Sequence, residues 1–239
     1  MKKILSVLLC ITFILCFSGC TYNPPDGWTK KQHTYDEVLS FARTIDPNAT
    51  VKEEYTDTVD EYDWEFREWD AVINGVECHV ASVSDWVWND GFAAGEFVKV
   101  HYRIDTDYDY ITMQSILADN YSNWKVGDSI RDKYHHNTNT IFAELNLPEY
   151  KMLSDDELEQ VWQTALKINS EYTKQAIERK AGFSIPSPGK YYNQGDDEYI
   201  IKNDSHAYIE EFTEAGKKAF LQEYKEDWAL LESGLPIRD

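Results

Sequence analysis

Three basic side chains alternate along one predicted strand of an acidic chain. Lys99, His101 and Arg103 are separated by single residues, and side chains two positions apart on a strand share a face. The alternation predicts that the residues on the opposite face point inward, namely Val98, Val100, Tyr102 and Ile104. An outward basic row can bind an anion or an acidic ligand. The alternative, which we favour, is cross-strand pairing with outward acids such as Glu77 and Glu65, worth roughly a few tenths of a kcal/mol per pair.

Two tryptophans stand just before a turn signal in the preceding strand. Trp86 and Trp88 precede Asn89-Asp90-Gly91. Aromatic rings at the rim of a loop can stack on a sugar face or anchor a partner protein. Packing at a strand end explains them equally well, because the chain holds 8 Trp and 16 Tyr. Both tryptophans therefore join the basic row as candidate ligand-binding residues.

Alternating acids follow the basic row. Asp105, Asp107 and Asp109 have the spacing that opens an EF-hand calcium loop, but Tyr110 replaces the glycine at its sixth position and Ile116 the glutamate at its twelfth. We interpret the run as a turn of solvated acids at a strand end. A weak Ca²⁺ site stays open as the alternative if a second acidic loop folds beside it.

The remaining motifs predict neither a metal-binding site nor a catalytic nucleophile. His135 and His136 are adjacent and point apart on a helix or strand, and no HExxH or CxxC pattern accompanies them. The chain lacks GxSxG and SxxK, and Ser84 and Asp85 are strand neighbours that face opposite sides. With 43 Asp+Glu, no particular acid pair is singled out for glycoside hydrolysis. We expect no metal and no cofactor, and whether the protein is an enzyme stays open, with a preference against it.

The first twenty residues have the features of a secretory leader. Lys2 and Lys3 precede a nearly unbroken apolar run over residues 4–17, which is shorter than the roughly 20 residues needed to cross a bilayer. A basic start, a short apolar core and small residues after it are typical of signal peptides. Phe17-Ser18-Gly19-Cys20 resembles the lipobox of bacterial lipoproteins, with Phe where Leu is commoner.

This resemblance implies a lipid anchor on Cys20. Cleavage would remove residues 1–19, and Cys20 would carry a diacylglyceryl thioether on its sulfur and an acyl chain such as palmitate on its new amine. Two or more acyl chains suffice for stable anchoring. The mature chain would then stand at the extracytoplasmic face of the cell membrane. The alternatives are an ordinary cleavable signal and an uncleaved anchor.

The charge balance limits the classes of partner that the protein is expected to bind. The formal net charge is −20, and loss of the two leader lysines leaves 21 Lys+Arg against 43 Asp+Glu, or −22. A generic nucleic-acid binder is excluded because phosphate contacts need a basic face. A basic protein partner is favoured, since opposite charge speeds encounter. Cys78 would be the one thiol left in the mature chain, so no internal disulfide is expected.

A tether and then a helix are predicted after the leader. Residues 20–33 contain Pro-Pro and Asp-Gly pairs and are interpreted as the tether. Thr34 and Glu37 have the spacing of a capping box, and helical apolar spacing continues to Ile45. Asp46-Pro47 should end this helix, because a residue before proline avoids the helical region.

The next segment predicts antiparallel strands. Asn74-Gly75 favours a type I′ hairpin turn between strands 62–73 and 76–83. Cys78 shares a face with valines and is expected to be a buried small hydrophobe. The apolar phase flips near Arg67, which predicts a bulge or burial on both faces. A helix followed by such a meander resembles the PepSY-like and cystatin-like units of secreted proteins in element order alone.

From about residue 120 the pattern becomes helical. Ser154 and Glu157 predict a second capping box, on a helix expected to run to about Lys180 and stop at Gly182. Three further elements are predicted: a loop at 186–189, a short hairpin of 199–202 and 207–212, and a helix from about 213 to 233.

These patterns predict an α+β fold. Residues 34–120 form a helix-plus-antiparallel-sheet region, and residues 121–239 form a helix-rich region that can pack with it as one domain. The function expected is that of a lipid-anchored extracytoplasmic binding protein whose ligand is a small molecule or a protein, with a basic protein as the specific version. The alternative is a cell-envelope hydrolase acting on a glycan or a peptide.

Overall fold

The computed structural model describes residues 28–60, 64–88, 97–127, 133–134, 139–193 and 198–238. The fold is α+β, as predicted. It divides into two compact units, which we describe separately. Unit 1 holds the described residues up to Ala71 together with Val80–Asp105, and unit 2 holds Val72–His79 and the described residues from Thr106 onward.

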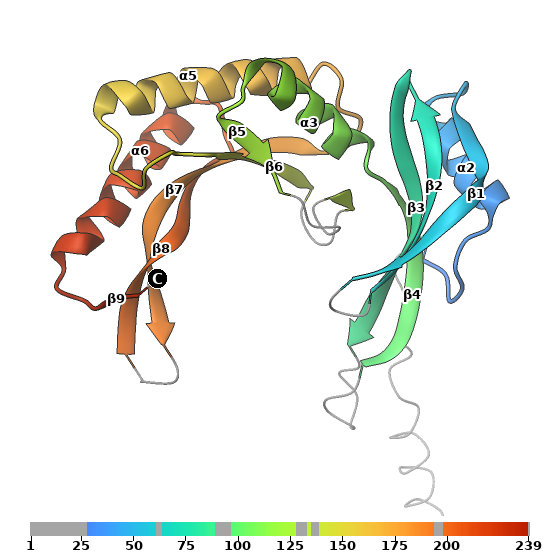
Figure 1. Cartoon of the computed structure of the whole chain (residues 1–239), viewed down its shortest axis with the longest axis horizontal. Helices are drawn as coiled ribbons and strands as arrows, with labels where there is room; N and C mark the ends of the chain where they lie inside the picture. The colour runs from blue at the N-terminus through green and yellow to red at the C-terminus, as the bar shows by residue number, and fades with distance from the viewer. Residues whose placement is uncertain are drawn as a thin grey trace, which may run out of the picture. The chain divides into compact units, whose positions relative to one another are not determined.

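Unit 1 is built from one helix and a four-stranded antiparallel sheet (Figure 1). The elements are α2 (Tyr35–Ile45), β1 (Thr50–Val59), β2 (Glu65–Ile73), β3 (Val76–Trp88) and β4 (Phe97–Thr106). The strand order is β1-β2-β3-β4, so each strand pairs with its neighbour in sequence. The hairpin end of β2 and β3 belongs to unit 2.

The local signals predicted for the first helix and for the hairpin turn are both confirmed. The Glu37 carboxylate accepts the backbone N–H of Thr34 at 2.7 Å, Thr34 Oγ1 accepts from the Glu37 N–H, and the helix ends at Ile45. Asn74 and Gly75 have φ of 49° and 78° at the hairpin turn. The predicted phase flip is also present, since Phe66 and Trp69 are both buried although three positions apart.

Unit 2 pairs a five-stranded mixed sheet with three α-helices. The elements are α3 (Tyr108–Asn120), β5 (Trp124–Val126), β6 (Thr140–Leu145), α5 (Asp155–Tyr172), β7 (Lys180–Asn193), β8 (Glu198–Ile209), α6 (Glu214–Ala229), the 3₁₀ helix η1 (Leu230–Glu232) and β9 (Ile237–Arg238). The strand order is β5-β6-β7-β8-β9, with the β6–β7 and β8–β9 pairs parallel. Figure 1 shows α3 and α5 over one face of this sheet. Their buried side chains meet those of the sheet and α6 in one core cluster.

The capping box of α5 is confirmed, but the predicted end of that helix is wrong. The Glu157 carboxylate accepts the Ser154 N–H at 2.7 Å. The helix stops at Tyr172, and Gly182 lies inside β7. After a turn in which the Ala176 N–H bonds the Tyr172 carbonyl, the buried carboxylate of Asp109 binds the backbone N–H groups of residues 177–179, so helical pairing does not resume there.

The predicted loop at 186–189 and hairpin of 199–212 are also wrong. Residues 186–189 belong to β7, and β8 is one continuous strand that pairs with it antiparallel. The pairing register shifts between Ser187 and Gly189, so the ladder is irregular at Pro188, which has no N–H to donate. The last predicted helix is confirmed as α6 and η1, capped by Thr213, with Gly234 at φ 77° after it.

Helix α3 was not predicted. Its N-cap is Asp107, in the acidic run interpreted above as a turn. Within the described residues, no helix is both long enough and apolar enough to span a membrane.

Candidate functional site

The predicted outward basic row is not present. His101 is 1% exposed, so its outward placement is wrong. Arg103 forms an ion pair with the buried carboxylate of Asp105 and lies 6.0 Å from the ring of Trp28. The side chains of Trp86, Trp88 and Lys99 lie outside the described residues.

The segment before α2 pairs with β4 at one point. Thr29 and Tyr102 exchange two backbone hydrogen bonds, of 2.9 and 2.8 Å, so the segment before α2 extends along β4. The Tyr102 hydroxyl donates to Glu65 at 2.8 Å, and the Tyr102 side chain is half-buried rather than part of the core. This pairing lies beside β4 rather than over one of its faces, so it does not by itself explain the burial of His101.

The acidic run is not a solvated turn. Asp105, Asp107 and Asp109 are 4%, 0% and 4% exposed, which overturns that interpretation. Each carboxylate has its own donors: Arg103, His79 and the 177–179 backbone. Buried acids need such partners because desolvation of an unpaired carboxylate is costly. The three carboxylates therefore have structural roles, each fixing a different part of the chain.

His79 and Asp107 form the most enzyme-like pair among the described residues. Asp107 Oδ1 accepts the backbone N–H of His79 at 2.6 Å, and Oδ2 lies 2.8 Å from His79 Nδ1. The His79 side chain is 36% exposed, whereas Asp107 is fully buried. This geometry favours the tautomer that donates from Nδ1, which leaves Nε2 as the basic nitrogen. Such a histidine can act as a general base.

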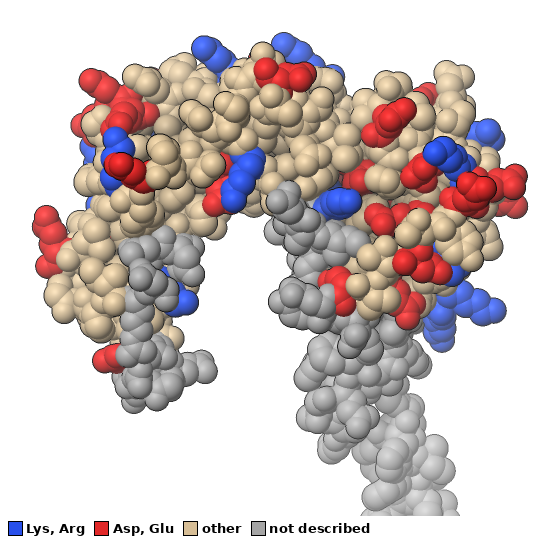
Figure 2. Space-filling model, in the orientation of Figure 1, with Lys and Arg blue, Asp and Glu red and all other residues tan. Residues whose placement is uncertain are grey.

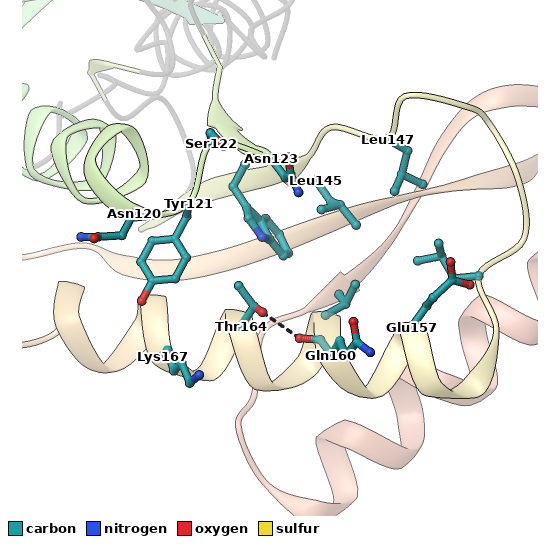
Figure 3. A pocket seen from close by; sticks show the side chains of 13 residues that line it. Asn120, Tyr121, Ser122, Asn123, Leu145, Leu147, Glu157, Gln160, Thr164 and Lys167 are labelled. Carbon is teal, nitrogen blue, oxygen red and sulfur yellow. Dashed lines mark hydrogen bonds between the residues drawn. The ribbon is translucent and has the colours of Figure 1, made fainter.

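A groove of ligand size runs along α5 in unit 2. Its volume is about 520 Å³, and we call it the α5 groove. Its walls are residues 120–124, the chain from Leu145 to Leu153, and one face of α5. In Figure 3, Tyr121 points from one wall toward α5, while Gln160 and Thr164 project from the helix into the space between.

The lining of the α5 groove combines an apolar floor with neutral polar groups. The apolar members are Trp124, Leu145, Leu147, Leu153 and Val161, and the amide or hydroxyl members are Asn120, Tyr121, Ser122, Asn123, Gln160 and Thr164. One charged group stands near each end of the α5 face, Glu157 and Lys167. Polar lining residues outnumber the apolar ones, so the groove offers many hydrogen-bond donors and acceptors around a small apolar floor.

Two titratable groups in the groove have settled protonation states. The pKa of Glu157 is lowered to about 2, chiefly by the hydrogen bond from the Ser154 backbone and then by Lys151, so this carboxylate is ionised. Burial raises the pKa of Tyr121, and its hydrogen bond to Glu171 at 2.8 Å raises it further. Tyr121 is therefore a neutral donor at physiological pH.

The described residues contain no group of three or more His, Cys, Asp and Glu side chains arranged to hold a metal ion. His135 and His136 lie outside the described residues. Cys78 is buried, as predicted, and burial raises its pKa to about 12, with the charge of Asp107 adding to the effect. A thiol in this state is a poor nucleophile.

Comparison with known proteins gives no match among family models, curated proteins or solved structures. The geometry of the two units therefore carries the functional argument.

Sequence reasoning missed both the α5 groove and the His79–Asp107 pair. The groove draws neutral residues from three separate segments, and neutral amides form no recognisable motif. His79 and Asp107 lie 28 positions apart. The one available signal was Asp107 itself, because Asp is a preferred N-cap and the following residues can form a helix.

Proposed function

We propose that this protein is a lipid-anchored binding protein at the extracytoplasmic face of the cell membrane, and that the α5 groove holds an extended segment of a basic partner protein. The observation that carries the proposal is the groove of about 520 Å³, with side-chain amides and hydroxyls above an apolar floor.

The polar lining suits a polypeptide. Asn123 and Gln160 each offer a donor and an acceptor, which is what the main chain of an extended peptide requires. Leu147 and Val161 are partly buried hydrophobic residues that can receive its apolar side chains. Neutral lining groups also avoid the desolvation cost that buried charges would add on binding.

Charge favours a basic partner. The formal net charge is −20, and acidic side chains are spread over both units on the face drawn in Figure 2. A field of this sign accelerates encounter with a cationic protein and weakens as salt is added. Anchoring follows from the lipobox resemblance of Phe17-Ser18-Gly19-Cys20 and would hold the body outside the cell.

Site-specific photocrosslinking tests the groove. A benzophenone amino acid is placed at Gln160, which lines the groove, or at Gln163, an exposed glutamine of the same helix that does not line it. We expect a discrete protein adduct from position 160 alone, weaker at high salt, with a basic protein identified by mass spectrometry. Equal adducts from both positions, or none from position 160, would refute the proposal.

Fatty-acid labelling tests the anchor. Cells expressing the protein are fed a radioactive fatty acid, with Cys20→Ser as the control. We expect label in the wild-type chain and none in the variant. An unlabelled wild-type chain recovered from the cytosol would refute the anchoring.

A cell-envelope hydrolase acting on a glycan or peptide is the second candidate, and the His79–Asp107 pair supports it. Hydrolysis would require His79 Nε2 to remove a proton from water or a hydroxyl as it attacks. The test is release of soluble fragments from purified cell wall and from a peptide mixture, with His79→Gln as the matched variant. Absence of turnover by the wild-type chain would exclude this candidate.

A further inference from the structure

Strand β1 is an edge strand of the sheet in unit 1. The strand order β1-β2-β3-β4 gives it β2 as its one strand neighbour within the described residues. It is ten residues long, and the six consecutive side chains of residues 52–57 are all exposed. An edge strand presents backbone N–H and C=O groups on its open side, and another chain can pair with them. We call residues 53–57 the β1 edge.

The register of β1 on β2 shows which backbone groups point outward. The Asp60 N–H donates to the Trp64 carbonyl at 3.0 Å, so the backbone of residue 60 faces the β2 side. In an antiparallel pair, residues whose backbone groups face the neighbouring strand alternate with residues whose groups face away. The N–H and C=O of Glu53, Tyr55 and Asp57 therefore point away from β2.

Two side-chain contacts agree with this register. The Arg67 guanidinium donates to the Asp57 carboxylate at 2.8 Å, and the rings of Tyr55 and Trp69 lie 5.6 Å apart. Both pairs are directly opposite each other when residue 60 is opposite residue 64. Opposite side chains come closest in the pairs whose backbone groups point away from the partner strand. Residues 55 and 57 therefore have outward backbone groups.

The fold itself pairs one outward carbonyl of β1 with a donor from outside the sheet. The Tyr35 hydroxyl of α2 donates to the Val51 carbonyl at 3.1 Å. Val51 has the same phase as residues 53, 55 and 57. Within the described part of the chain, no side chain or loop forms a hydrogen bond to the outward backbone groups of those three residues. The β1 edge can therefore accept a further strand.

The charges on the β1 edge decide which strand it accepts. Glu53 and Glu54 are exposed and have no ion-pair partner among the described residues, whereas the Lys52 ammonium is held by Asp70 at 2.7 Å. Exposed charges on an edge strand discourage association between copies of the same chain. They also favour a neighbouring strand of opposite charge, because opposite charges on paired strands attract.

A second copy of this chain does not fit the β1 edge. Antiparallel pairing of two copies about Tyr55 would place Glu53 opposite Asp57, and parallel pairing in register would place each acid opposite its own copy. Like charges directly opposite each other destabilise a strand pair. Lysine or arginine side chains at those positions would reverse the sign of the interaction. Tyr55, which is 52% exposed, offers such a strand an aromatic neighbour.

We propose that the β1 edge binds an extended strand of a basic polypeptide by adding it to the sheet of unit 1. The outward backbone groups of residues 53, 55 and 57 hydrogen-bond to the main chain of that strand. Glu53 and Glu54 select lysine or arginine side chains on its two faces. This inference does not depend on the α5 groove, since the two surfaces belong to different units.

The test uses the full chain in detergent micelles and a labelled peptide. The probe is a fluorescein-labelled peptide in which lysine alternates with threonine, and its match carries glutamate in place of lysine. Binding is followed by fluorescence anisotropy at about 0.15 M ionic strength, where distant charges are largely screened. We expect saturable binding of the lysine peptide and none of the glutamate peptide.

Hydrogen exchange locates the bound peptide. The amides of residues 53, 55 and 57 should exchange more slowly when the lysine peptide is present, because their N–H groups become bonded. The amides of residues 54 and 56 already face β2 and should change little. This alternation is specific to strand addition, since a peptide held by side-chain charges alone would not produce it.

Charge variants separate the β1 edge from the general acidity of the chain. Replacing Glu53 and Glu54 together by glutamine should weaken binding about tenfold, or about threefold for each exposed ion pair. The matched control replaces Glu149 and Glu232 by glutamine, which removes the same charge from two exposed positions of unit 2. The control should bind the lysine peptide as the wild-type chain does.

A proline variant tests the backbone groups. Glu53→Pro removes an outward N–H and places a ring on the open side, and it leaves the hydrogen bonds between β1 and β2 intact. It should bind the lysine peptide more weakly than Glu53→Gln, which removes the charge alone. Its melting temperature should stay close to that of the wild-type chain.

Four results would overturn the proposal. They are no binding of the lysine peptide, equal binding of the glutamate peptide, equal losses from the paired variant and its control, and protection without the alternation at residues 53–57. Self-association of the chain that Glu53→Pro abolishes would assign the edge to a second copy and also overturn it. None of these results bears on the crosslink expected at Gln160, so the groove proposal is tested separately.

Discussion

The carboxylate of Asp109 holds the chain between α5 and β7, and its removal should destabilise unit 2. Asp109 Oδ1 accepts the N–H of Ile177 at 2.8 Å, and Oδ2 accepts those of Glu178 and Arg179 at 2.9 and 2.8 Å. The side chain is 4% exposed, so water does not replace it freely. We predict the effects of Asp109→Ala and Asp109→Asn.

The magnitude follows from the surroundings of the three donors. A hydrogen bond to a charged group contributes roughly 1.5–3 kcal/mol, but contributions within one network are not additive. The bonds to Ile177 and Glu178 are part-buried, so these N–H groups can find water, whereas the bond to Arg179 is buried. We therefore expect a loss of about 3 kcal/mol for the alanine variant, and about half of that for asparagine, which keeps one acceptor oxygen.

Hydrogen exchange and denaturation measure this loss. The alanine variant should lower the melting temperature by about 10 °C, and the amides of residues 177–179 should exchange faster. Asp119→Ala is the matched control, because it removes the same charge from an exposed position on the same helix. If Asp109→Ala proves no more destabilising than Asp119→Ala, the reasoning on how β7 begins is refuted.

Three further outcomes are expected. Cys78, whose pKa burial raises to about 12, should resist iodoacetamide at pH 8 in the native protein and react fully in denaturant, as mass spectrometry would show. Gly182→Ala should cost roughly 1–3 kcal/mol in chemical denaturation, because its Cβ would lie 2.5 Å from the Phe142 ring. Since the pKa of Glu157 falls from 4.5 to about 2 on folding, its contribution to stability is full above pH 4.5 and is lost as the pH falls toward 2. An NMR titration of Glu157, with Ser154→Ala raising the midpoint, checks this.

Local signals in the sequence located several elements well. The capping boxes at Thr34 and Ser154 each involve residues three apart, and the Asn74-Gly75 turn involves adjacent residues. Interactions at this range need no knowledge of the rest of the chain. The same reasoning placed Gly234 after the last helix.

The errors arose where distant residues decide the local structure. Helical spacing continues past Tyr172, but the helix does not resume after the turn that follows, because Asp109 binds Ile177 across 68 positions. Pro186 and Pro188 suggested a loop, yet pairing with β8 keeps the chain extended on both sides of an irregular register. His101 is buried although the alternation along its strand predicts that it faces outward. Patterns of polarity within one strand carry no information about such partners.

The burial of Asp105, Asp107 and Asp109 changes how the net charge should be interpreted. Each of these carboxylates is inside the protein and donor-bound, so none contributes fully to the field that an approaching partner meets. The Arg103 guanidinium is also neutralised locally, because it forms an ion pair with Asp105. The attraction that we propose for a basic protein therefore depends on exposed acids. Asp119 and Glu77 are of that kind, because both are exposed at the surface. The proposed recognition of a basic partner is therefore expected to depend on exposed acids of this kind rather than on the total count of carboxylates.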